Sequence, residues 1–206
     1  MNQCARPERC ASLLLLCCLL VACAVPGYVK PTIKIGLSAP FEGLYRDVGY
    51  EALYAVRLAV RERNQSGGVD GRYLVELVAL NDFCEPEEAV VQASKMAVDP
   101  DVLGVLGGCS PEVVVAVFPE YRQARMAFVF PAETWTQIDV LPNSLPDPEF
   151  VAAYGVLSGG VPPGPVASWA YAAANRLLDA LDVAAVAQGE LTRAGVLQAL
   201  AVDHEP

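Results

Sequence analysis

The chain has 206 residues, a net charge of -10 at pH 7 and a hydrophobic share of 54%. The negative charge argues against a nucleic-acid-binding protein, because such proteins neutralise phosphates with a basic surface. The length favours a single domain.

The first 22 residues are typical of a secretory signal. Arg6 and Arg9 precede an apolar run at 11–22, which is shorter than the roughly 20 residues that a membrane-spanning helix needs. The run leads into the sequence LVAC at 20–23, which resembles a bacterial lipobox. We therefore expect Cys23 to be acylated and to anchor the protein without spanning the membrane. The alternative is an ordinary secretory signal whose small residues precede a cysteine.

Few cysteines lie outside this signal. Of seven in the chain, four lie in the predicted signal and Cys23 is the expected lipid site, which leaves Cys84 and Cys109. Two cysteines in an exported domain suggest one disulfide. It would close a loop of about 25 residues and stabilise the fold by roughly 3.5 kcal/mol. The alternative is two separate buried thiols.

Strands and helices alternate along the following part of the chain. Apolar runs predict strands at 33–37, 73–80, 102–106 and 126–130. Between them the sequence predicts an amphipathic helix that carries Ala52, Val56 and Ala59 on one face, and helices at 86–98 and 111–124 that begin with proline. This alternation predicts an α/β fold, with a parallel four-stranded sheet in the order 2-1-3-4 and helices on both faces.

The C-terminal part is predicted to be helical. The segment 137–149 contains three prolines and is too short to hold a domain, so we interpret it as a linker. Helices are predicted at 150–157, at 166–187 and from an N-cap at Thr192 to about residue 201. The expected organisation is a signal at 1–22, a tether at 23–32, a lobe at 33–136, the linker at 137–149 and helices at 150–202 that pack on the same lobe.

The predicted topology places a ligand crevice between the first and third strands. In open parallel sheets, ligands bind beyond the carboxyl ends of the strands, where the strand order reverses. The loops at 38–45 and 107–110 follow these two strands. We therefore expect the two loops to face each other across the crevice.

The loop after the third strand has the composition of an anion site. Gly107 and Gly108 let the backbone approach a ligand closely. Ser110 is a favourable N-cap, and Pro111 suits the first position of a helix. The free N–H groups at the start of that helix attract an anion, and the Ser110 hydroxyl adds a hydrogen bond. Such a site suits a carboxylate, and a purely structural helix start is the alternative.

The segment after the fourth strand supplies acceptors for a cation. The carbonyl of Ala132, the hydroxyl of Thr134 and the carboxylate of Glu133 are all able to receive an ammonium group. An anion site beside a cation site describes an amino acid. For Glu133 the alternative is a solvated loop charge.

Several short motifs follow one another in a characteristic order. They are IKIG at 33–36, YRD at 45–47, NDFCEP at 81–86, GCS at 108–110 and PAET at 131–134. In these motifs the chain resembles the N-terminal lobe of the branched-chain amino acid (leucine/isoleucine/valine) binding proteins of ABC transporters, which have the type I periplasmic binding protein fold. The run from Phe150 to Tyr171 matches the closing segment of that family more loosely, with Ala172 where an acid is usual.

The resemblance implies roles for individual residues. It implies a disulfide between Cys84 and Cys109 across the top of the first strand. The implied ligand-binding residues are Ser110 for the carboxylate, Ala132 and Thr134 for the α-amino group, and Tyr45 for the pocket wall. For Tyr45 the alternative is a half-exposed loop aromatic. We also place Cys109 and Glu133 in the same site, although Glu133 departs from the family.

The chain departs from this family in one respect. A family member would insert a second lobe of roughly 100 residues or more where this chain has only the segment 137–149. The crevice would then be open on one side. We expect an affinity no better than about millimolar unless a homodimer or a partner lobe covers the site.

These observations lead to two hypotheses about function. The first is a lipid-anchored extracytoplasmic solute-binding protein, truncated to one lobe, that binds amino acids of the branched-chain type and acts with an ABC permease or in sensing, without a cofactor. The second is a protein-interaction module at the membrane surface that keeps the scaffold but not the ligand. An enzyme is the weakest interpretation, because the sequence has no nucleophile elbow, P-loop or metal-ligand cluster.

Overall fold

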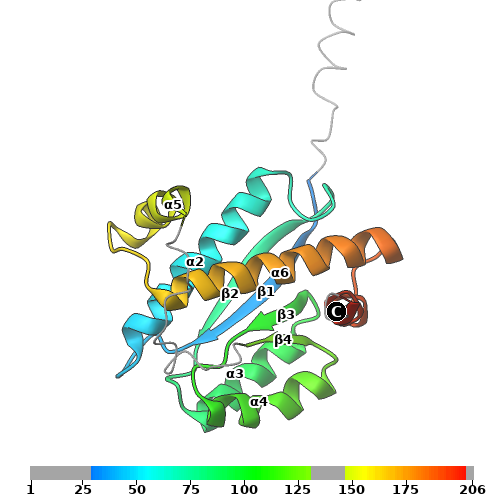
Figure 1. Ribbon diagram of the computed structural model, residues 1–206. Coiled ribbons are helices and arrows are strands. Elements are labelled where there is room, and N and C mark those ends of the chain that lie inside the picture. Colours follow the sequence, from blue (N-terminus) through cyan, green and yellow to red (C-terminus); the bar gives the residue numbers. More distant parts are fainter. Residues whose placement is uncertain (1–28, 131–146, 203–206) are drawn as a thin grey trace, which may run out of the picture. The chain divides into compact units, whose positions relative to one another are not determined.

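The computed structural model describes residues 29–130 and 147–202 (Figure 1). The predicted signal, Cys23 and the predicted ligand residues Ala132, Glu133 and Thr134 lie outside these ranges. Within the described ranges, none of the helices combines the length and apolar character that crossing a membrane requires.

Four parallel strands form one sheet. The strands are β1 (Thr32–Ala39), β2 (Leu74–Asn81), β3 (Val102–Leu106) and β4 (Ala127–Val129). Their order is β2-β1-β3-β4, which confirms the prediction. All five residues of β3 are buried, because this strand lies inside the sheet with helices on both faces. A strand that is covered on both faces has no solvent-facing positions, which explains why the sequence of β3 contains no polar side chain.

Helices cover both faces of the sheet. They are α2 (Arg46–Gln65), α3 (Pro86–Val98), α4 (Pro111–Gln123), α5 (Pro148–Ser158), α6 (Pro165–Gln188) and α7 (Arg193–Val202). α3 and α4 pack together on one face, whereas α2, α6 and α7 lie on the other, with α5 against α2 (Figure 1).

Two glycines in the central strands allow helices to pack closely from opposite sides. A Cβ atom on Gly36 would lie 2.6 Å from the Sδ of Met96 in α3. A Cβ atom on Gly104 would lie 2.7 Å from the Cδ1 of Leu177 in α6. Both distances are below van der Waals contact, so any larger residue would push a helix away from the sheet.

The long helix α6 is held at both ends by side chains from the N-terminal half. At its start, the N–H of Ala167 donates to the Oε1 of Glu51 in α2 over 2.8 Å. At its end, Arg72 donates to the carbonyl oxygens of Ala185 over 2.7 Å and Gly189 over 2.9 Å. An acid at the start and a base at the end oppose the helix dipole. The C-terminal helices are therefore fixed to the lobe by charge as well as by packing.

Arg193 attaches α7 to the amino edge of the sheet. Its guanidinium donates to the carbonyl oxygen of Val102, at the start of β3, over 2.8 Å. It also donates to the carbonyl oxygens of Ala97 over 3.0 Å and Asp99 over 2.5 Å at the end of α3. The last carbonyls of a helix have no partner within it, so Arg193 supplies one.

Two N-caps define the starts of α5 and α7. α5 begins at Pro148 because Asp147 accepts a hydrogen bond from the N–H of Glu149 over 3.0 Å. The last two residues of the predicted linker are therefore helical. Thr192 accepts a hydrogen bond from the N–H of Gly195 over 3.1 Å, as its predicted N-cap role requires.

Candidate functional site

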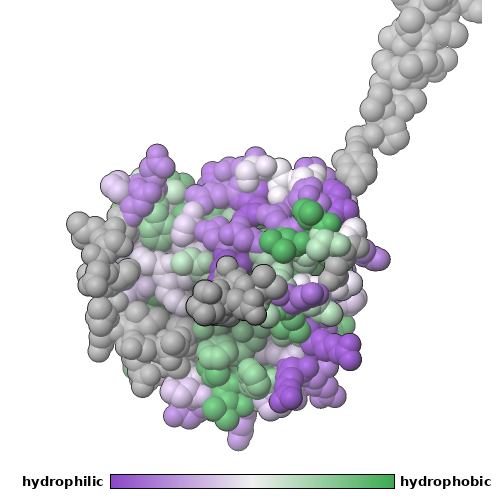
Figure 2. Space-filling model, turned by 45° about the vertical axis from the view of Figure 1, so that its right-hand side comes forward, coloured by the Kyte–Doolittle hydropathy of each residue, from purple (hydrophilic) through white to green (hydrophobic). Residues whose placement is uncertain are grey.

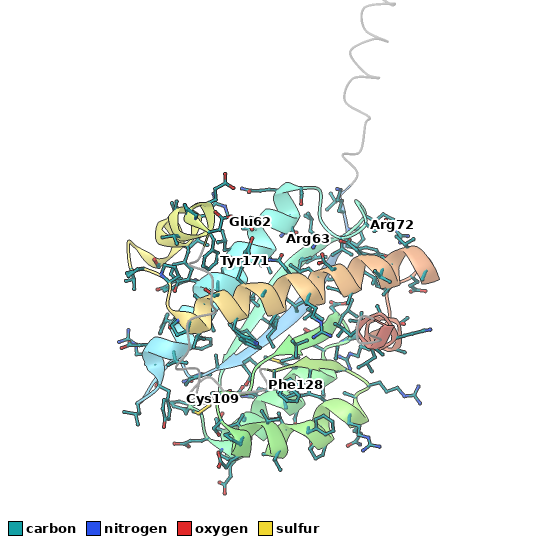
Figure 3. All side chains as sticks on the ribbon, in the orientation of Figure 1. Glu62, Arg63, Arg72, Cys109, Phe128 and Tyr171 are labelled. Carbon is teal, nitrogen blue, oxygen red and sulfur yellow. A yellow bond between two sulfur atoms is a disulfide. The ribbon has the colours of Figure 1, made fainter. Side chains whose placement is uncertain are left out.

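At the carboxyl edge of the sheet, the loop after β3 contacts the end of β1. The strand order reverses between these two strands. A Cβ atom on Gly107 would lie 3.2 Å from the carbonyl oxygen of Ser38 and 3.2 Å from the Cε2 of Phe128. Glycine therefore lets the loop after β3 lie close to the end of β1. Cys109, labelled in Figure 3 together with Phe128, belongs to the loop after β3.

Ser110 begins α4 at this edge. Its Oγ accepts a hydrogen bond from the N–H of Val113 over 3.3 Å, and Pro111 takes the first helical position, as predicted. The exposed Glu112 reports the local electrostatics, because its own backbone N–H and then the Ser110 hydroxyl lower the pKa of its carboxyl group. This helix end therefore stabilises a carboxylate.

A disulfide between Cys84 and Cys109 joins the loops after β2 and β3. The two Cα atoms are 5.7 Å apart, within the usual range for a disulfide, and the predicted pairing is confirmed. Phe83 and Cys84 have φ angles of 54° and 61°, which residues other than glycine rarely adopt. Cys109 is fully buried, so the disulfide fastens the loop after β2 to the core.

Two polar residues beyond the predicted set fasten the same edge. Ser38 donates a hydrogen bond to the Asp82 carboxylate over 2.8 Å, and the N–H of Cys84 donates to it over 2.9 Å. Asp82 is fully buried, and desolvation raises the pKa of its carboxyl group despite these hydrogen bonds. Both residues are polar and lie at the carboxyl ends of neighbouring strands. This position could have identified them from the sequence as part of the site.

Asn81 ties together the loops after β1 and β2. Its Oδ1 accepts hydrogen bonds from the N–H of Phe41 over 2.8 Å and from the N–H of Phe83 over 3.1 Å. Tyr45 lies in the first of these loops, directly before α2, and is 36% exposed. This exposure is compatible with both interpretations of Tyr45, the pocket wall and the half-exposed loop aromatic.

The structure thus describes only part of the predicted site. Tyr45, Ser110 and the disulfide come to one edge of the sheet, whereas Ala132, Glu133 and Thr134 are outside the described residues. The ammonium half therefore stays a prediction. Among the residues that the structure describes, no group of His, Cys, Asp and Glu side chains could hold a metal ion.

Comparison with known proteins agrees with this architecture. A family model described as periplasmic binding protein matches residues 32–148, which is more than half of the chain. The chain belongs to the periplasmic binding protein family. Members of this family are extracytoplasmic substrate-binding proteins and not enzymes, as the sequence predicts.

A curated relative of this periplasmic binding protein carries a more specific name. The leucine-, isoleucine-, valine-, threonine- and alanine-binding protein of Pseudomonas aeruginosa is 29% identical over 125 residues, which are 58% of this chain and 33% of the relative. The chain spans about a third of the length of the curated relatives it matches.

Solved structures share the fold. The isoleucine complex of a branched-chain amino acid transporter substrate-binding protein from Streptococcus pneumoniae has a TM-score of 0.65 at 13% identity, over 82% of this chain and 88% of that chain. A fatty acid ABC transporter substrate-binding protein from Thermomonospora curvata has a TM-score of 0.65 at 16% identity, over 85% and 82%. The resemblance inferred from the motifs is thus confirmed for family and fold.

Proposed function

We propose that this chain is a lipid-anchored solute-binding protein for amino acids of the branched-chain type, linked to ABC transport or sensing. The observation that carries the proposal is the electropositive start of α4 beside the junction of β1 and β3, with Ser110 as its N-cap. An anion site at the strand-order reversal of this fold fits the carboxylate of an amino acid. The names of relatives that bind leucine, isoleucine and valine favour an aliphatic side chain.

In the proposed complex, the two charged groups of the ligand meet two loops. Ser110 and the first N–H groups of α4 receive the carboxylate. The carbonyl of Ala132 and the hydroxyl of Thr134 accept hydrogen bonds from the α-amino group, and Glu133 places a negative charge in the same site. Tyr45 forms part of the pocket wall, and the disulfide through Cys109 keeps the loop in place.

The anchor and the division into segments belong to the same proposal. Acylation of Cys23 would hold the chain beside an ABC permease in the membrane. The proposed segments are the signal at 1–22, the tether at 23–32, the binding lobe at 33–136, the linker at 137–149 and the closing helices at 150–202. The docking of α6 between Glu51 and Arg72 supports assigning the last segment to the same lobe.

A single lobe leaves the crevice open on one side. The described strands form one sheet, and a site that encloses only part of its ligand binds weakly. We therefore propose an affinity no better than about millimolar for the isolated chain. A partner lobe or a second copy would complete the enclosure.

Thermal unfolding of the full chain with leucine, isoleucine and valine tests this function. A millimolar ligand at about ten times its dissociation constant stabilises the folded state by about 1.4 kcal/mol, which raises the Tm by about 3–5 °C in a domain of this size. Leucinol keeps the amine and the side chain but lacks the carboxylate, so it should give no shift. The absence of a shift with all three amino acids would overturn the proposal.

A pair of cap variants isolates the role of Ser110. Ser110→Gly removes the hydroxyl but keeps a residue that is tolerated at an N-cap, so stability falls by only a few tenths of a kcal/mol, while the leucine-dependent shift is lost. Thr192→Gly makes the same change at the start of α7, away from the carboxyl edge, and should keep the shift. Equal responses of both variants would argue against Ser110 as the carboxylate contact.

A protein-interaction module without a ligand is the second candidate function. The single sheet formed by the described strands favours it, because the crevice is then free to receive another protein. This alternative predicts that no amino acid changes the Tm.

A further inference from the structure

The outward sides of α6 and α7 form an apolar surface, which we call the α6–α7 face. Two of its valines are exposed to solvent: Val183 is 57% exposed and Val186 71%. A groove of about 790 Å³ runs between the two helices. The apolar residues of the face are Ala172, Val183, Val186 and Ala187 of α6 and Ala199 of α7, and Asn175, Arg176, Asp179 and Gln198 also line the groove.

The two helices make this face concave. In Figure 1, α6 lies across the view, whereas α7, at the end marked C, is seen almost end-on, so α7 stands out beside α6. Figure 2 turns this side forward and shows apolar patches interspersed with hydrophilic side chains. A helix from another molecule would fit along α6 and against α7.

Charge distinguishes this face from the chain as a whole. The chain has a net charge of -10, but α6 and α7 together contain two aspartates and two arginines, so their charges cancel. Asp182 contacts Arg63 and accepts a hydrogen bond from the N–H of Asp70 over 2.6 Å. Arg193 is engaged by backbone carbonyls. Two strongly acidic molecules repel each other least where their surfaces are neutral.

The other two charges, Arg176 and Asp179, have opposite signs on the outward stripe of α6, and both also interact within their own chain. Arg176 lies one turn before Asp179, whose side chain is 69% exposed although it contacts Arg63. If two α6 helices run antiparallel about a two-fold axis centred between Leu177 and Leu178, Arg176 of each copy lies opposite Asp179 of the other. The same axis sets Ala172 opposite Val183, so a small residue meets a larger one.

We propose that two copies of this chain associate through the α6–α7 face, with their α6 helices antiparallel. A helix of 24 residues is about 36 Å long and about 10 Å wide, so α6 with the adjoining side of α7 buries on the order of 500 Å² per copy. The total of about 1,000 Å² is close to the lower bound for a specific interface. The dimer is therefore weak and reversible.

This dimer leaves the ligand site accessible. The α6–α7 face lies over one face of the sheet, whereas the candidate site is at the carboxyl edge. In this dimer the second copy does not cover the crevice, so of the two covers proposed above only a partner lobe would complete the enclosure.

Light scattering on the full chain tests the association. The monomer mass is 21.9 kDa, and the mean mass should rise toward twice this value between about 1 and 100 µM, the range in which a weak dimer forms. Val183→Asp should raise the dissociation constant at least tenfold, because it places an acid within the contact, opposite the apolar Ala172 of the second copy. Arg176→Glu should weaken the dimer similarly by facing Asp179 of the second copy.

A matched control exists on the opposite face of the sheet. Val115 on α4 is 74% exposed, and Val115→Asp makes the same substitution without touching the α6–α7 face. It should leave the dissociation constant unchanged. A dimer that persists in Val183→Asp and Arg176→Glu, or a wild-type chain that stays monomeric at about 100 µM, would overturn the proposal.

Vesicles provide the second decisive measurement. The vesicle test uses Cys23→Ser chains, which lack the proposed acylation site. If the monomeric Cys23→Ser chain floats with phosphatidylcholine vesicles and the same chain with Val183→Asp does not, the face binds lipid and the dimer proposal is wrong. The amino acid response of Val183→Asp is measured in parallel. Because that response depends on the carboxyl edge, it survives in this variant even if the dimer proposal fails.

Discussion

The two ends of the sheet use their polar groups differently. At the amino edge, the Arg193 guanidinium donates to the carbonyls of Val102, Ala97 and Asp99, and its donors serve stability. At the carboxyl edge, the start of α4 lowers the pKa of an exposed carboxyl group, and Tyr45 is 36% exposed. The carboxyl edge therefore keeps hydrogen-bonding groups within reach of solvent, as the proposed binding site requires.

The carboxyl edge is nevertheless well supported from below. Ser38, Asp82 and Asn81 fix the backbone of the loops, and the disulfide crosses between them. This division of labour resembles that of many ligand sites, in which buried polar contacts hold a loop so that its exposed groups point to the ligand.

Removal of the disulfide should cause the largest loss of stability among the variants that distinguish the two edges of the sheet. The double variant Cys84→Ser/Cys109→Ser should lose up to about 3.5 kcal/mol of unfolding free energy, because the unfolded chain gains the entropy of an open loop. Urea unfolding measures this loss. The leucine-dependent Tm shift should also fall, since the loop that carries Ser110 is no longer held.

Arg193→Ala should weaken the contacts at the amino edge and leave the carboxyl edge unchanged. Several carbonyls lose their donor, so the free energy of unfolding should fall by about 2–3 kcal/mol. Arg193→Lys should recover only part of this loss, because one ammonium group cannot reproduce the planar array of donors. Isothermal titration below the unfolding transition should find amino acid affinity unchanged. A parallel loss of affinity would show that the two edges are coupled.

Asp82→Asn should have the smallest effect and should depend on pH. Burial raises the pKa of the folded-state carboxyl group, so the stability that this group contributes is greatest below its unfolded pKa and is lost as pH rises through its folded pKa. The wild-type chain should therefore gain stability relative to Asp82→Asn as pH falls from about 7 toward about 4. Urea unfolding at several pH values measures the difference in unfolding free energy between the two proteins. A difference that does not change with pH would contradict the raised pKa of Asp82.

Much of the fold follows from local patterns. The apolar run of β3 and the proline starts of α3 and α4 lie at the predicted residues, because these signals arise from neighbouring residues. The start of α5 was less accessible, since a proline-rich segment resembles a linker until Asp147 is recognised as its cap. The Ser110 cap was predictable for the same reason: its hydrogen-bond partner is three residues away.

The sequence by itself determined the α/β class, the strand order, the disulfide and the start of α4 at Pro111 with Ser110 as its N-cap, because periodicity, helix caps and cysteine number are local or compositional properties. Only the tertiary structure decided that Ser38 binds Asp82, that Glu51 caps α6 and that Arg193 binds Val102. These partners are 44, 116 and 91 residues apart. Such contacts depend on how packed elements align in space, which one-dimensional patterns do not encode.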